Sequence, residues 1–142
     1  MFLDASAIIA ILGDEEDAEH LLAKASAAQQ GVSYSPLSGY EAVIGLAHKL
    51  MGRAGQPIDP RLIEGAEKAV EAFFFSIGAR EIPITGEIGR DAIAAYKRYG
   101  RGAGHPAKLN LGDCFAYACA RAHRLPLLFK GNDFLHTDIE RA

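Results

Sequence analysis

Four acidic residues stand where side chains commonly take part in chemistry. Asp4 follows the apolar run "MFL", Asp113 opens the apolar segment "LNLGDCFAYACA", and Asp133 follows the run "PLLFK". The fourth acid, Glu41, lies in the segment that follows "GVSY". Each has an ordinary structural explanation when taken alone. Asp4 and Asp113 suit helix starts, and Asp133 suits a turn. Glu41 could form a capping box with Ser38.

As a set, the acids predict a cation site. Carboxylates that lie within about 5 Å raise one another's pKa, so gathering them is costly unless a cation neutralises them. Mg²⁺ prefers oxygen ligands and is typically held by one or two carboxylates, with water and substrate phosphate completing its coordination. An acidic set without clustered His or Cys favours Mg²⁺ or Mn²⁺ over zinc. Such a site suits the attack of water on a phosphodiester.

Short apolar runs alternate with helical patterns along the chain. Strands are expected within 1–5 and at 31–34, 81–84 and 126–130, and helices at 6–12, 13–28, 35–51, 59–77, 85–99 and 111–123. Asp14, Ser35 and Asp59 are the expected caps of three helices. The segment 51–58 is expected to be a loop. This alternation predicts an α/β fold with a mostly parallel sheet covered on both faces. Sites in such sheets gather beyond the carboxyl ends of the strands and at adjoining helix starts.

Length and composition predict one domain, residues 1–142, since a chain of 142 residues with 49% hydrophobic content can bury a core. The chain shows neither a signal-peptide pattern nor an apolar run of roughly 18 residues, so we expect a soluble, cytoplasmic protein without a membrane segment.

Its two cysteines, Cys114 and Cys119, match no disulfide or zinc spacing and are expected in the core. The net charge of −3 argues against bulk electrostatic coating of nucleic acid but allows a local basic groove.

Four segments carry a resemblance to a known family. "MFLDASAIIAIL", "SPLSGYEAVIGLA", "LNLGDCFAYACARA" and "LLFKGNDFLHTDI" resemble, in order and over essentially the whole chain, the four acidic motifs of the PIN domain. The likeness is strongest to the VapC-type toxin ribonucleases of type II toxin-antitoxin systems. It implies a three-layer α/β/α domain with a central parallel sheet. It further implies that the domain cleaves RNA with Mg²⁺ or Mn²⁺.

The resemblance also implies roles for individual residues. Asp4 and Asp113 would bind one or two metal ions, and Glu41 and Asp133 would hold water or a second ion. The acids so marked as catalytic and metal-binding are Asp4, Glu41, Asp113 and Asp133. Supporting polar positions of the motifs are matched by Ser6, Asn110 and Asn132. Asp138 matches a recurrent family acid, for which a structural role is an equal alternative.

The implied partners are an RNA substrate, a small antitoxin lying across the active site, and a second copy of the chain in a homodimer. The densest basic stretch, 96–110, directly precedes Asp113. Its candidates for RNA phosphate contacts are Lys97, Arg98, Arg101 and Lys108. A solvated helix end and loop is the alternative interpretation of this stretch. The run "FFF" at 73–75 cannot lie on one helical stripe, so one ring is expected to meet another helix or another subunit.

Several other functions remain to be compared with this hypothesis. A haloacid dehalogenase type of phosphatase needs a second Asp two residues after the first, where this chain has Ser6. A nucleotide-binding loop is not supported, because "YGRGAGHPAK" lacks the preceding strand and the Lys-Ser/Thr ending. A catalytically silent PIN-like module that binds proteins is an alternative. So is a housekeeping RNA-processing nuclease without an antitoxin.

Overall fold

The computed structural model describes residues 1–52, 57 and 59–142, and most of the expected loop at 51–58 lies outside them. None of the helices in these residues is long and apolar enough to cross a membrane. The elements follow in the order β1 (Phe2–Leu3), α1 (Ala5–Leu12), α2 (Ala18–Ser26), β2 (Ser33–Tyr34), α3 (Pro36–Met51), α4 (Pro60–Ser76), β3 (Arg80–Glu81), α5 (Gly86–Tyr99), the 3-10 helix η1 (Arg101–Ala103), α6 (Leu111–Ala122) and β4 (Leu127–Leu128).

A parallel sheet forms the centre of the fold, with its strands in the order β3-β2-β1-β4. Phe2 of β1 pairs with Ser33 of β2 on one side and with Leu127 of β4 on the other. The chain moves outward from β1 to β3 and then returns to the opposite side of β1. This reversal places a topological switch point between β1 and β4, where ligand sites of open α/β sheets occur.

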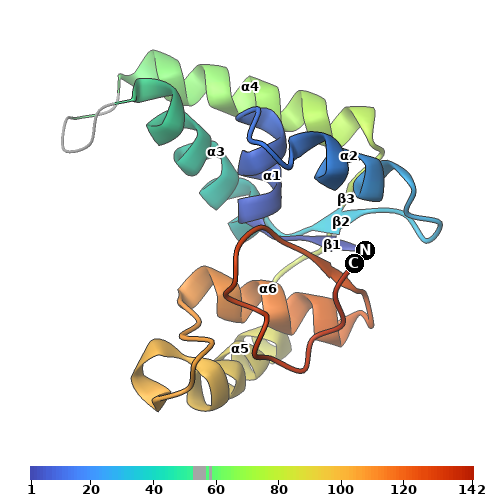
Figure 1. Cartoon of the computed structure of the whole chain (residues 1–142), viewed down its shortest axis with the longest axis vertical. Helices are drawn as coiled ribbons and strands as arrows, with labels where there is room; N and C mark the ends of the chain where they lie inside the picture. The colour runs from blue at the N-terminus through green and yellow to red at the C-terminus, as the bar shows by residue number, and fades with distance from the viewer. Residues whose placement is uncertain (53–56, 58) are drawn as a thin grey trace.

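Helices cover both faces of the sheet, as Figure 1 shows: α1 to α4 lie on one side, and α5 and α6 lie on the other. Successive strand residues alternate between the two layers, as the pleat of a strand requires. Phe2 and Leu127 belong to the core cluster under α5 and α6, whereas Leu3 and Leu128 belong to the opposite cluster. Both cysteines are buried and free, as expected. The predicted three-layer α/β/α arrangement is confirmed.

Two of the predicted helix starts have the expected capping bonds. The hydroxyl of Ser35 accepts from the backbone N–H of Ser38 at 3.1 Å, and Pro36 opens α3. The carboxylate of Asp59 accepts from the backbone N–H of Arg61 at 2.9 Å, and α4 follows. These caps satisfy backbone donors that the first turn of a helix leaves unpaired.

Two boundary predictions are wrong. Asp14 does not cap a helix: it adopts a left-handed conformation (φ 50°) in the turn after α1, and α2 begins only at Ala18. Asp is among the residues that tolerate this conformation, which explains why it suits the turn. The third strand pairs at Arg80–Glu81 rather than over 81–84. Pro83 has no N–H to donate to a ladder, so it disfavours a longer strand.

The three consecutive phenylalanines of α4 divide between core and surface. Phe73 and Phe74 are buried, and the Phe74 ring stacks on Tyr34 with centroids 3.7 Å apart. Phe75 is 90% exposed. The prediction that the three rings cannot share one stripe is therefore confirmed, and two of them pack in the core.

The packing of α3 predicts unequal effects of two identical substitutions. Leu46 is 2% exposed and Leu50 is 58% exposed, both on this helix. Leu46→Ala leaves a cavity and is expected to lower the free energy of unfolding by about 2–5 kcal/mol. Leu50→Ala is expected to change it by less than about 0.5 kcal/mol. Urea unfolding followed by circular dichroism measures both, and equal effects would contradict this packing.

Candidate active site

Asp4 lies at the carboxyl end of β1 and caps α1. Its Oδ2 accepts hydrogen bonds from the backbone N–H of Ser6 at 2.9 Å and from the Ser6 hydroxyl. The residue is only 5% exposed. Burial raises the pKa of Asp4 above its ordinary value, the bonds from Ser6 oppose this, and the negative charge of Asp133 raises it further. The cap explains how Asp4 is oriented but not why a buried carboxylate faces another acid.

Asp113 is oriented by a capping box at the start of α6. Asn110 Oδ1 accepts from the N–H of Asp113 at 3.0 Å, and Asp113 Oδ2 accepts from the N–H of Asn110 at 2.7 Å. Asp113 is 8% exposed, and burial raises its pKa to about 6. The charges of Asp4 and Asp133 add to this rise, and that of Arg101 opposes it. Asn110 therefore fixes the side chain of an acid that lies among other acids.

Glu41 extends from the second turn of α3 toward the start of α6. The expected capping box with Ser38 is not formed, because Ser35 caps this helix and accepts the N–H of Ser38 itself. A Cβ atom added at Gly112 would overlap both carboxylate oxygens of Glu41, so the carboxylate lies directly against the first turn of α6. Burial raises the pKa of Glu41 to about 7, and the charges of Asp4 and Asp113 contribute.

Asp133 lies in the exposed loop that follows β4. The turn before it uses Gly131 in a left-handed conformation (φ 95°), which glycine adopts without a steric penalty. The negative charge of Asp133 raises the pKa of both Asp4 and Asp113. Its neighbour Asn132 is also exposed. The structure thus brings all four predicted acids into electrostatic contact.

The donor set suits a hard divalent cation. Its ligands would be carboxylate oxygens, and in the residues that the structure describes Glu41 forms no hydrogen bond although it is half-buried beside two acids. Within the same residues no three His, Cys, Asp or Glu side chains converge into a ready-made metal site. Mg²⁺ commonly retains several water ligands and needs only one or two carboxylates, so an open arrangement fits this ion.

The basic residues before Asp113 have different surroundings. Arg101 Nε donates to the backbone carbonyl of Lys108 at 3.2 Å, and its charge lowers the pKa of Asp113. Lys97 and Lys108 are exposed. Arg98 forms an ion pair with Asp138 at 3.0 Å. Arg101 is therefore the member of this stretch that acts on the acids.

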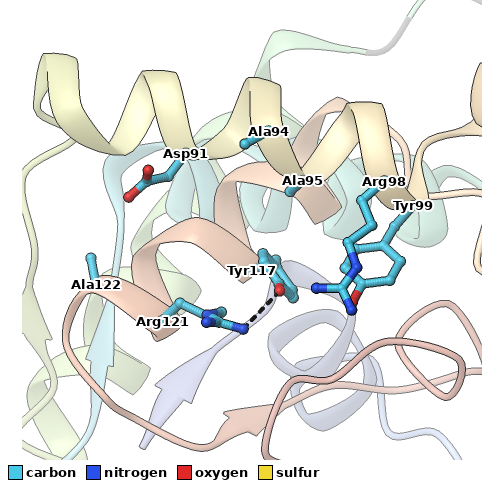
Figure 2. A pocket seen from close by; sticks show the side chains of 8 residues that line it. All are labelled: Asp91, Ala94, Ala95, Arg98, Tyr99, Tyr117, Arg121 and Ala122. Atoms are coloured by element: carbon cyan, nitrogen blue, oxygen red, sulfur yellow. Dashed lines mark hydrogen bonds between the residues drawn. The ribbon is translucent and has the colours of Figure 1, made fainter.

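Asp138 joins the C-terminal segment to α5 and α6. Its Oδ1 accepts from the Tyr117 hydroxyl at 2.5 Å, and its Oδ2 accepts from Arg98 and Arg121, each at 3.0 Å. The Tyr117 bond and the Arg121 charge lower the pKa of Asp138 to about 2. Tyr117 and the two arginines line a hollow of ≈ 340 Å³ between these helices (Figure 2). These contacts give Asp138 a structural role.

Two residues near the acids were not singled out from the sequence. Gly112 provides the space that the Glu41 carboxylate occupies, and a glycine in the first turn of a helix was the available signal. Lys130 donates its backbone N–H to the Ser6 hydroxyl oxygen at 3.0 Å. Its position in "FKGND", three residues before the fourth acid, gave no indication of this contact.

Comparison with known proteins shows the family to which the chain belongs. The PIN domain family matches residues 1–140. A VapC ribonuclease of Rhizobium meliloti is 42% identical over 97% of this chain and 98% of its own length. Ribonuclease VapC28 of Mycobacterium tuberculosis is 45% identical over 100% of this chain and 97% of its own. The chain therefore belongs to the PIN-domain family and, within it, to the VapC-type ribonucleases.

A solved structure supports the fold independently. A chain of a toxin-antitoxin complex from Klebsiella pneumoniae superposes with a TM-score of 0.65. The match covers 96% of this chain and 92% of the other at 19% sequence identity. At this identity the likeness shows that the two chains share a fold.

The raised pKa values predict how stability depends on pH in metal-free protein. Glu41 has a pKa of about 7 when folded and about 4.5 when unfolded, so the folded state binds its proton more tightly and loses stability as pH rises between these values. Glu41→Gln is therefore expected to raise the melting temperature in EDTA at pH 8 but not at pH 4. Glu64→Gln, at an exposed position of α4, is the matched control. A melting temperature unchanged by Glu41→Gln at pH 8 would contradict the buried acidic cluster.

Proposed function

We propose that the protein is a Mg²⁺- or Mn²⁺-dependent endoribonuclease that acts as the toxin of a toxin-antitoxin pair. The observation that carries this proposal is the gathering of four acids from separate segments at the switch point between β1 and β4. Burial raises the pKa of Asp4, Glu41 and Asp113, and the charges of neighbouring acids raise it further. Membership of the VapC-type ribonucleases supports the same reaction.

In this function Asp4 and Asp113 hold the ion. Each uses Oδ2 as a hydrogen-bond acceptor near a helix start, which fixes the direction of the carboxylate. Glu41 and Asp133 hold water or a second ion around the same place. A bound divalent cation supplies Lewis acidity that activates water and stabilises charge on the phosphate. Ser6 and Asn110 act through the acids that they orient.

RNA approaches a site that repels it when no cation is bound, so its affinity depends on the ion and on nearby basic residues. We assign the phosphate contact first to Arg101, because its charge already acts on Asp113. Lys97 and Lys108 are further candidates on the same exposed stretch. Arg98 is the weaker candidate, since its guanidinium pairs with Asp138.

This assignment predicts a difference between two arginine variants. Arg101→Gln is expected to weaken binding of single-stranded RNA. It should also make the slope of log K against log salt concentration shallower by about one, because binding then releases one counterion fewer. Arg98→Gln is expected to leave the salt slope unchanged. Fluorescence anisotropy over a salt series measures both with Mg²⁺ present, in otherwise wild-type protein and with a phosphorothioate RNA that resists cleavage. Equal slopes for the two variants would remove Arg101 as a phosphate contact.

The proposed partners are a small antitoxin that covers the active site and a second copy of the chain, in the cytoplasm. The antitoxin proposal is supported by membership of the VapC-type ribonucleases and by the shared fold with a chain of a toxin-antitoxin complex. A basic antitoxin side chain placed against the acids would neutralise them as a cation does. A silent protein-binding module and a housekeeping nuclease are the competing functions, and both lack the growth arrest that an uncovered toxin causes.

The proposed reaction predicts that substitution of Asp113 lowers metal-dependent cleavage of RNA. Asp113→Asn is expected to lower RNA cleavage at least about a hundredfold, because it weakens the hold on the cation that stabilises developing charge, and losing one such stabilising group typically costs about 10²–10³ in rate. Asp91→Asn, at an exposed position of α5, is the matched control and should cleave as the wild type does. Total RNA is incubated with each folded protein in Mg²⁺, Mn²⁺ or EDTA. No cleavage by the wild type with either ion would favour the silent module.

A further inference from the structure

We propose that Lys130 is a positioning residue that fastens the loop carrying Asp133 beside Asp4 and thereby sets the affinity of the site for a divalent cation. This inference rests on the proposed metal-dependent function. It concerns the way in which the loop after β4 is held rather than the acids themselves.

The backbone of Lys130 connects this loop to Asp4. Its N–H donates to the hydroxyl oxygen of Ser6 at 3.0 Å, and the same hydroxyl donates to Asp4 Oδ2. Ser6 therefore bonds at once to the first acid and to the segment that leads to the fourth. Any shift of residue 130 changes a bond that also orients Asp4.

The side chain of Lys130 makes a second attachment, to the segment between α1 and α2. Its Nζ contacts Glu15 Oε2 and lies 2.7 Å from Asp17 Oδ1, both in the segment between α1 and α2. The other oxygen of Glu15 contacts Lys49 Nζ of α3 at 2.6 Å. Single exposed ion pairs contribute little to stability. A part-buried cation shared by two carboxylates restricts where residue 130 can lie, whatever its net energy.

The position of Asp133 depends on anchors at either end of a short exposed loop. In the described residues no hydrogen bond restrains the Asp133 carboxylate, and Gly131 allows wide backbone freedom. After the loop, Phe134 is almost fully buried in the core. Before the loop, the attachment is Lys130. Releasing the lysine side chain leaves the segment before Asp133 attached only by the backbone bond of Lys130 to Ser6.

The test compares Lys130→Met with Lys49→Met. Both substitutions remove one positive charge and one ion pair with Glu15, and Lys130→Met also removes the ion pair with Asp17. Only Lys130→Met removes a side-chain attachment of the loop that carries Asp133. Loss of a positive charge by itself makes the surroundings more negative and should tighten binding of a divalent cation. Weaker binding is therefore the signature of lost positioning. We expect Lys130→Met to raise the Kd for Mn²⁺ about 10–100-fold, as changes in groups that orient ligands do.

Two readouts separate positioning from general stability. Calorimetric titration gives the Kd for Mn²⁺ without RNA, and cleavage over a Mn²⁺ series gives the half-saturating concentration and kcat at saturation. Lys130→Met should raise the half-saturating concentration while kcat at saturation stays within about threefold. Lys49→Met should leave the Kd equal to or below that of the wild type. The double variant Glu15→Gln with Asp17→Asn also frees the lysine, but it removes two negative charges, which by itself weakens cation binding. Its matched control is Glu16→Gln with Glu19→Gln, which removes two exposed negative charges from the same region. The first double variant should raise the Kd more than this control does, and adding Lys130→Met to it should raise the Kd no further.

The outcomes distinguish this inference from the proposed function. Suppose that the wild type binds Mn²⁺ and cleaves RNA. If Lys130→Met then binds Mn²⁺ as Lys49→Met does, and the Glu15/Asp17 double variant binds it as the Glu16/Glu19 control does, the positioning role is wrong and the nuclease stands. Lys130→Met could melt below the assay temperature. The Glu15/Asp17 double variant, which leaves residues 130–133 unchanged, then tests the positioning role by its Kd for Mn²⁺ alone. If the wild type binds no Mn²⁺, both the proposed function and this inference are overturned.

Discussion

The burial of carboxylates close to one another is the constraint on which the rest of this structure depends. Asp4, Glu41, Asp113 and Asp133 come from different segments, and each acts electrostatically on at least one other. In the metal-free protein this arrangement opposes folding at neutral pH, because the folded state holds protons that the unfolded chain releases. Two core clusters, one on each face of the sheet, offset this cost. A bound cation would remove it.

Structural and catalytic explanations of the same acids are compatible here. Asp4 is a helix cap and Asp113 belongs to a capping box, as each would be in a protein without activity. Those hydrogen bonds use one carboxylate oxygen and fix the orientation of the side chain. Ordinary capping therefore fixes the orientation of two of the four acids. Among the residues that the structure describes, Glu41 receives no such bond, and its place is set by the space beside Gly112.

Much of the fold follows from local sequence patterns, whereas the contacts of the site depend on distant segments. Alternation of short apolar runs with helical periods predicts the parallel sheet, and Ser35 and Asp59 begin their helices as expected. Asp14 misleads because the same residue type suits both a cap and a left-handed turn. The four acids could be identified from the sequence by their residue type and by their positions relative to the predicted strands and helices. The pairing of Arg98 with Asp138, 40 residues away, has no local signal.

The central claim is that the acids hold a divalent cation at the switch point between β1 and β4. Anomalous diffraction from crystals soaked in MnCl₂ measures this most directly, because manganese is located without reference to activity. We expect a manganese peak within bonding distance of carboxylate oxygens of both Asp4 and Asp113, and no such peak in crystals of the Asp113→Asn variant. A fully soaked wild-type crystal with no peak there, or with manganese bound only at other surface acids, would contradict the claim.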